Sequence, residues 1–120
     1  DWVTFTGRPD VTADIEHRFG LRVIGDSMSE LYPHGTIVEC VSLFGRAEAL
    51  AGKRVVIVRR RDDLLYEATV KELVEIDGAL WARPRSHNPA HQAFRIDQPE
   101  PGIIEVRIAA VVVSSIRPEP

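Results

Sequence analysis

This chain of 120 residues has one cysteine, no long hydrophobic run and no excess of basic charge. Cys40 cannot form a disulfide within the chain, and its apolar neighbours predict a small buried side chain in a reducing cytosol. The longest apolar run, residues 108–113, is only as long as a strand, whereas a membrane-spanning helix needs roughly 20 residues. We therefore expect a cytoplasmic protein with no membrane segment.

The charge balance argues against direct contact with nucleic acid. The formal net charge is −3 at pH 7, and the only basic run, residues 59–61, is typical of the solvated end of a hairpin. The chain shows no helix-turn-helix pattern, no zinc-finger spacing and no basic stripe interleaved with aromatic residues. A glycine-rich phosphate loop before a helix is also missing, and we expect no cofactor.

Strand signals dominate the sequence. Turn residues separate segments rich in Val, Ile and Leu, and these segments are residues 21–24, 36–41, 54–60, 65–76, 79–82 and 103–116. Asp77-Gly78 predicts a two-residue hairpin turn, because both positions tolerate positive φ. Residues 42–52 predict one short helix. The fold class is therefore mostly β, a compact antiparallel barrel-like or packed-sheet domain.

The length suits one domain with one core. We divide the chain into a lead-in of residues 1–20, interpreted as the remnant of a linker, and a domain of residues 21–120. The first residue is Asp rather than Met, which predicts a fragment of a longer polypeptide.

Two residues carry the clearest chemical signal. Ser27 stands in Gly25-Asp26-Ser27-Met28 just after a predicted strand, and Lys71 stands inside the apolar segment 65–76. A serine hydroxyl is a poor nucleophile unless a base takes its proton, and a lysine serves as that base only when burial makes it neutral. The glycine permits a sharp turn that would aim the backbone N–H groups of Asp26 and Ser27 at a common oxyanion position. The pair predicts a Ser-Lys dyad.

The acidic neighbours of Lys71 set a condition on that prediction. Its pKa must fall from about 10.4 toward 7 or 8 for it to act as a base. A salt bridge to Glu67 or Glu72 would keep the amine charged and inactive. Strand alternation places Glu67 and Thr69 on the same face as Lys71, and Glu72 on the opposite face.

The two segments Gly25-Asp26-Ser27-Met28 and Thr69-Val70-Lys71 together resemble the LexA-like C-terminal domains of self-cleaving repressors and their UmuD-like relatives. The resemblance covers about residues 21–113, including the loop 84–89, which is similar to the family's Asn-Pro turn after the lysine hairpin. It implies that Ser27 is the nucleophile, that Lys71 is its general base, and that the amides of Asp26 and Ser27 are the oxyanion donors.

The resemblance also implies a function and partners. Family members are homodimers that cut a peptide bond in their own linker, and RecA filaments stimulate the cut. We therefore expect the regulatory domain of a transcriptional repressor in the DNA-damage (SOS) response, which contacts DNA only through a missing N-terminal domain.

The cleavage site is where the chain departs from the family. Members typically carry Ala-Gly or Cys-Gly upstream of the serine, whereas residues 1–26 contain neither, and Thr6-Gly7 is the nearest approximation. Ala51-Gly52 lies between serine and lysine, where a turn before a strand is expected. One alternative is therefore a dimerisation or partner-binding module with a vestigial dyad. Another is the soluble part of a signal-peptidase-like protease, which also uses a serine followed by Met and a later lysine.

The histidines give weaker signals. His87 and His91 lie four residues apart, but Pro89 breaks the helix that would place them on one face, and no Glu or Cys joins them, so we expect no metal site. A triad on Ser27 stays open, with these candidate bases and orienting acids: His17, His34, Asp10, Asp14 and Asp26.

Overall fold

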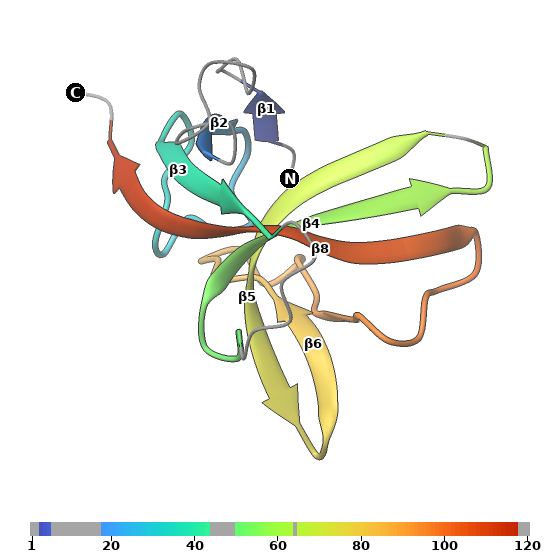
Figure 1. Ribbon diagram of the computed structural model, residues 1–120. Helices are drawn as coiled ribbons and strands as arrows, with labels where there is room; N and C mark the ends of the chain where they lie inside the picture. Colours follow the sequence, from blue (N-terminus) through green and yellow to red (C-terminus); the bar gives the residue numbers. More distant parts are fainter. Residues whose placement is uncertain (1–2, 6–17, 44–49, 64, 118–120) are drawn as a thin grey trace.

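The computed structural model describes residues 3–5, 18–43, 50–63 and 65–117. All regular structure in these residues is β, in one antiparallel sheet of eight strands (Figure 1). The strands are β1 (Val3–Phe5), β2 (Arg18–Val23), β3 (Ile37–Ser42), β4 (Arg54–Arg61), β5 (Tyr66–Ile76), β6 (Ala79–Arg83), β7 (Phe94–Arg95) and β8 (Ile103–Ile116). Their order is β1-β2-β3-β8-β4-β5-β6-β7. The mostly β prediction is confirmed, and the sheet does not close into a barrel.

All six predicted strands are present, as β2, β3, β4, β5, β6 and β8. The sequence did not indicate β1 or β7, because segments of three and two residues are too short to show a period. The predicted helix over 42–52 is wrong at its start, since Ser42 ends β3 in pairing with Ala110. Residues 44–49 lie outside the described part of the chain.

The hairpin between β5 and β6 has the predicted turn. Asp77 and Gly78 both adopt positive φ, 52° and 81°, and the flanking residues Ile76 and Ala79 pair directly. A turn with both central residues in this region matches the right-handed twist of the strands, so the tight connection fixes their register. Gly52, with φ of 89°, lies in the turn before β4, as expected for Ala51-Gly52.

The central strands bury side chains on both faces. Val56 of β4 belongs to a cluster with Cys40 and Val70, whereas its neighbours Val55 and Ile57 belong to a second cluster with these residues: Leu50, Leu73, Ala82 and Phe94. Because successive strand residues point to opposite faces, the two clusters cover the two sides of β4 and β5. Cys40 is fully buried as predicted, and burial raises the pKa of its thiol to about 12.

The uneven lengths of β5 and β6 create the space for a site. β4 pairs with β5 along residues 66–72, but β6 pairs only with residues 72–76. Lys71 is therefore flanked by Val55 of β4 on one side and by no strand on the other. The chain after β6 leaves the sheet before it returns as β7, and two residues of this excursion, His91 and Gln92, share a cavity with Lys71 of β5. The described residues contain no helix that could cross a membrane.

Replacing Leu73 with alanine tests the packing of the second cluster. Leu73 is 2% exposed, so Leu73→Ala should lower the free energy of unfolding by about 2–5 kcal/mol, through lost burial and the cavity left behind. Urea denaturation measures the change. Leu65→Ala is the matched control, because Leu65 is 57% exposed and should change stability by no more than about 0.5 kcal/mol. Equal losses for the two variants would contradict the assigned core.

Candidate active site

Ser27 lies in a tight turn that follows β2. Gly25 has φ of 92°, a left-handed conformation that favours glycine, and its N–H donates to Nδ1 of His34 at 2.8 Å. The turn continues with the N–H of Ser29 donating to the carbonyl of Asp26 at 3.1 Å. The next residue, Met28, is anchored in the core, and Ser27 itself is only 2% exposed. The turn therefore holds the hydroxyl in a nearly dry environment.

Lys71 meets Ser27 from β5. The distance from Lys71 Nζ to Ser27 Oγ is 3.0 Å, and Nζ also lies 2.5 Å from Thr69 Oγ1 and 3.2 Å from the carbonyl oxygen of Val70. A neutral amine has two N–H bonds and one lone pair. If it donates to Thr69 and Val70, its lone pair is left to accept the proton of the Ser27 hydroxyl. The three contacts accommodate either charge state: an ammonium donates to all three oxygens, and an uncharged amine donates to two and accepts from Ser27.

The electrostatic surroundings favour that uncharged state. Burial foremost, and the charge of Arg59 second, lower the pKa of Lys71 to about 8, against an opposing effect of Glu67. The side chain is 5% exposed. Roughly a tenth to a fifth of the amines are therefore neutral between about pH 7 and 7.4, on the order of a hundredfold more than for an exposed lysine.

Neither acidic neighbour forms a salt bridge to Lys71. Glu67 pairs with Arg59 at 2.8 Å, and Glu72 pairs with Arg83 and, at 2.9 Å, with Arg85. Burial opposes the charge on Glu72, but its hydrogen bonds and proximity to the two arginines outweigh that effect and keep its pKa below the ordinary value. The requirement that Lys71 form no salt bridge to Glu67 or Glu72 is therefore met.

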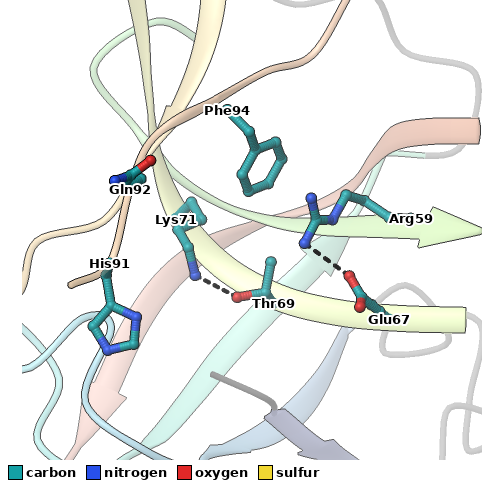
Figure 2. A pocket seen from close by; sticks show the side chains of 7 residues that line it. All are labelled: Arg59, Glu67, Thr69, Lys71, His91, Gln92 and Phe94. Atoms are coloured by element: carbon teal, nitrogen blue, oxygen red, sulfur yellow. Dashed lines mark hydrogen bonds and ion pairs between the residues drawn. The ribbon is translucent and has the colours of Figure 1, made fainter. Parts of the chain in front are cut away.

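A cavity of about 220 Å³ opens beside the lysine amine. It is lined by Arg59, Glu67, Thr69, Lys71, His91, Gln92 and Phe94. Figure 2 shows Lys71 directed at Thr69, with His91 and Gln92 on one side and the Arg59–Glu67 pair on the other. The Arg59 guanidinium stacks over the Phe94 ring, 4.2 Å from its centroid. Part of the basic run at 59–61 thus lies in the site, although the sequence indicated only a solvated hairpin end.

The loop that follows β6 fastens the serine turn from outside. The carbonyl of Arg85 accepts a hydrogen bond from the N–H of Glu30 at 2.8 Å, and the Ser86 hydroxyl donates to the carbonyl of Asp26 at 2.6 Å. The N–H of His87 donates to Ser29 Oγ at 3.2 Å. The loop after β6 therefore packs against the turn that carries Ser27, which the sequence of the loop alone did not indicate.

Asp26 is held by two side chains of the same loop. His91 Nε2 lies 2.6 Å from Asp26 Oδ1, and Asn88 Nδ2 donates to Asp26 Oδ2 at 3.3 Å. These hydrogen bonds, that of His91 foremost, lower the pKa of the carboxyl, which is therefore ionised at neutral pH. Within the described residues, the backbone N–H of Ser27 donates to no other residue.

The structure brings Ser27 and Lys71 into contact. The described triad candidates, His34 and Asp26, have partners other than the Ser27 hydroxyl. His34 accepts from a backbone N–H of the turn, and Asp26 pairs with His91. The remaining triad candidates lie outside the described residues: His17, Asp10 and Asp14. No cluster of three metal-ligating residues occurs in the described ranges. Sequence reasoning considered His91 only as a metal ligand and missed it as a partner of Asp26; its place two residues beyond Asn88-Pro89 was a signal for that role.

A comparison with protein families agrees with this arrangement. The model of the family described as Peptidase S24-like matches residues 4–113, nearly the whole chain. A search of curated proteins finds no match.

Replacing Lys71 by methionine should stabilise the protein near neutral pH, because the methionine side chain carries no charge into the core. The wild-type amine has a pKa of about 8 when folded and an ordinary value of 10.5 when unfolded. Between these pH values the unfolded chain holds a proton that the folded chain lacks, so wild-type stability rises with pH. The advantage of Lys71→Met should therefore shrink by roughly 3 kcal/mol across that interval.

Urea denaturation of both proteins at several pH values between about 7 and 11 measures the difference. Lys53→Met is the matched control, because Lys53 is exposed and its substitution should give no such pH dependence. A constant difference between Lys71→Met and wild type would contradict the lowered pKa.

Proposed function

Because the chain belongs to the Peptidase S24-like family, the family of LexA- and UmuD-type C-terminal domains, we propose that it is a serine peptidase with Ser27 as nucleophile and Lys71 as general base. The observation that carries the proposal is the 3.0 Å contact between a buried lysine amine and a buried serine hydroxyl. Nucleophile and base within hydrogen-bonding reach are the minimum that such chemistry requires.

The proposed reaction has two steps, formation of an ester on Ser27 and hydrolysis of that ester. Ser27 Oγ attacks the scissile carbonyl carbon, its proton passes to Lys71 Nζ, and the N–H groups of Asp26 and Ser27 donate to the resulting oxyanion. The C–N bond then breaks, and the Lys71 ammonium gives its proton to the leaving nitrogen. Water, deprotonated by Lys71, hydrolyses the ester and restores the Ser27 hydroxyl.

The biological role that we propose is the regulatory domain of a cytoplasmic transcriptional repressor that cleaves its own chain in the DNA-damage response. We propose that residues 1–20 form the end of a linker and that residues 21–120 form the peptidase domain. In the described part of that linker, β1 and the first residues of β2 pair into the sheet of the domain. The net charge of −3 supports contact with DNA through an N-terminal domain rather than through this domain. A RecA filament is the proposed stimulus, and no cofactor takes part.

A homodimer is part of the proposal. Val113 and Ile116 of β8 are 50% and 70% exposed, and Val113 borders a groove that also contains Leu31 and Tyr32. Exposed apolar side chains beside a groove are suited to contact with a second copy of the chain.

One observation favours a second candidate function. Residues 1–26 carry neither Ala-Gly nor Cys-Gly, the bond that the family typically cuts. The domain would then act as a dimerisation module in which the dyad is not used. The soluble part of a signal-peptidase-like protease is a further alternative, since that class also uses a serine followed by Met and a later lysine.

Removing either member of the dyad should abolish cleavage of the protein's own chain. Ser27→Ala and Lys71→Ala should each lower the cleavage rate by at least about 1,000-fold, because nucleophile and base act as a unit. The wild-type rate should rise about tenfold per pH unit below pH 8 and level off above it, as the amine of Lys71 loses its proton. Gel electrophoresis of protein incubated at different pH values measures the rate.

Lys53→Ala is the matched control for Lys71→Ala, because Lys53 is exposed, and this change should not alter the rate. If wild-type protein stays intact up to about pH 10 but reacts at Ser27 with a fluorophosphonate, the dyad is reactive and the chain carries no bond that it cuts. Protein that neither cleaves nor reacts would contradict the peptidase proposal.

Charged substitutions on β8 test the dimer. Ile116→Asp should dissociate it, because a carboxylate would be buried in an apolar contact. Sedimentation velocity measures the association state. Ile104→Asp is the matched control, since Ile104 is 49% exposed at the opposite end of the same strand and should leave the dimer intact. A wild-type monomer at all concentrations would refute this part of the proposal.

A further inference from the structure

The carboxylate of Asp26 lies where a negative charge is unfavourable for the proposed reaction. It belongs to the residue just before the nucleophile, and its own backbone N–H is one of the two proposed oxyanion donors. The backbone of the same residue is among the causes that lower the pKa of this carboxyl, after His91 and Asn88. An unrestrained carboxylate would therefore compete for the donor and would repel the oxyanion by its charge.

The loop after β6 counters this effect with three contacts to one residue. His91 and Asn88 bind the two carboxylate oxygens of Asp26, and the Ser86 hydroxyl donates to its carbonyl. Further hydrogen bonds brace the loop itself: the N–H of Asn88 donates to Ser86 Oγ at 2.9 Å, and Asn88 Oδ1 accepts from the N–H of Ala90 at 3.0 Å. Both the side chain and the backbone of Asp26 are thus fixed from the same side.

The position of His91 links this contact to the reaction site. Its imidazole lines the same cavity as Lys71, and Figure 2 shows it next to the lysine amine. The other charged groups around that cavity, Arg59 and Glu67, are paired with each other. Of the cavity-lining side chains, Lys71 contacts Ser27 itself, and His91 contacts the preceding residue, Asp26, at 2.6 Å.

From these contacts we propose that His91 is a positioning residue: it holds the Asp26 carboxylate away from the oxyanion site and so sets the orientation of the N–H groups of Asp26 and Ser27. The inference rests on the proposed peptidase function. His91 neither attacks nor takes a proton from the nucleophile. It acts through Asp26, and its effect falls on oxyanion stabilisation rather than on deprotonation by Lys71.

Reaction with a fluorophosphonate probe tests the proposal without a peptide substrate. Ser27 Oγ forms a bond to phosphorus, fluoride leaves, and the hydroxyl proton passes to Lys71 and then to solvent. The phosphoryl oxygen occupies the oxyanion position. His91→Ala should lower the maximum labelling rate about 10- to 100-fold, a loss comparable to or somewhat smaller than removal of one oxyanion donor.

The pH profile separates positioning from other roles. The midpoint of labelling against pH should stay near 8 in His91→Ala, because Lys71 still sets it. His91→Gln should restore most of the rate, since its amide can donate to Asp26. Thermal unfolding of both variants checks folding, and the His91→Gln result decides the matter if His91→Ala is unstable.

A double-mutant cycle with Asp26→Asn provides the decisive comparison. With the charge removed, adding His91→Ala should change the labelling rate less than twofold. An unchanged rate in His91→Ala, or fully additive losses in the double variant, would overturn the proposal. If His91→Ala shifts the midpoint pH of labelling but leaves the maximum labelling rate unchanged, the proposal is also overturned, because His91 would then act on the pKa of Lys71. Wild-type protein that is not labelled at Ser27 would instead contradict the peptidase function itself.

Discussion

The site depends on one buried amine without a carboxylate partner. Lys71 contacts a hydroxyl on each of two elements and one carbonyl, and these contacts satisfy the amine without fixing a positive charge on it. Burial without an ion pair is unfavourable for stability when the amine is protonated. The same burial is the main cause that lowers its pKa to about 8, as the proposed role of general base requires. A position that weakens the fold near neutral pH is thus the one on which the proposed chemistry depends.

The sheet provides this environment through a mismatch in strand length. β6 ends opposite Glu72, so Lys71, the residue before Glu72, pairs with no described strand on that side. The loop after β6 and the turn that carries Ser27 cover this unpaired position. Glu72 is directed to Arg83 and Arg85, and Glu67 to Arg59, which keeps both acids from pairing with the amine. The arginines therefore contribute to the state of Lys71 indirectly, by occupying its acidic neighbours.

Much of the fold could be predicted from local patterns. Runs of Val and Ile separated by turn residues located six strands, and Asp77-Gly78 located a hairpin, because both signals depend on neighbours in sequence. β1 and β7 could not be predicted, since strands of two or three residues form only by pairing with a longer neighbour. The start of the predicted helix failed for a related reason: Ser42 pairs with Ala110 of a distant strand.

The sequence by itself determined the strands, the glycine turn that carries Ser27, and the identity of Lys71 as a candidate base, because residue type and spacing are local properties. Only the tertiary structure decided that the two side chains lie 3.0 Å apart, that the acids beside Lys71 pair with arginines, and that His91 reaches Asp26. Those outcomes depend on strand order and on how a loop folds back across β5. The physical reason is that desolvation and charge pairing depend on neighbours in space, which no local pattern of residues specifies.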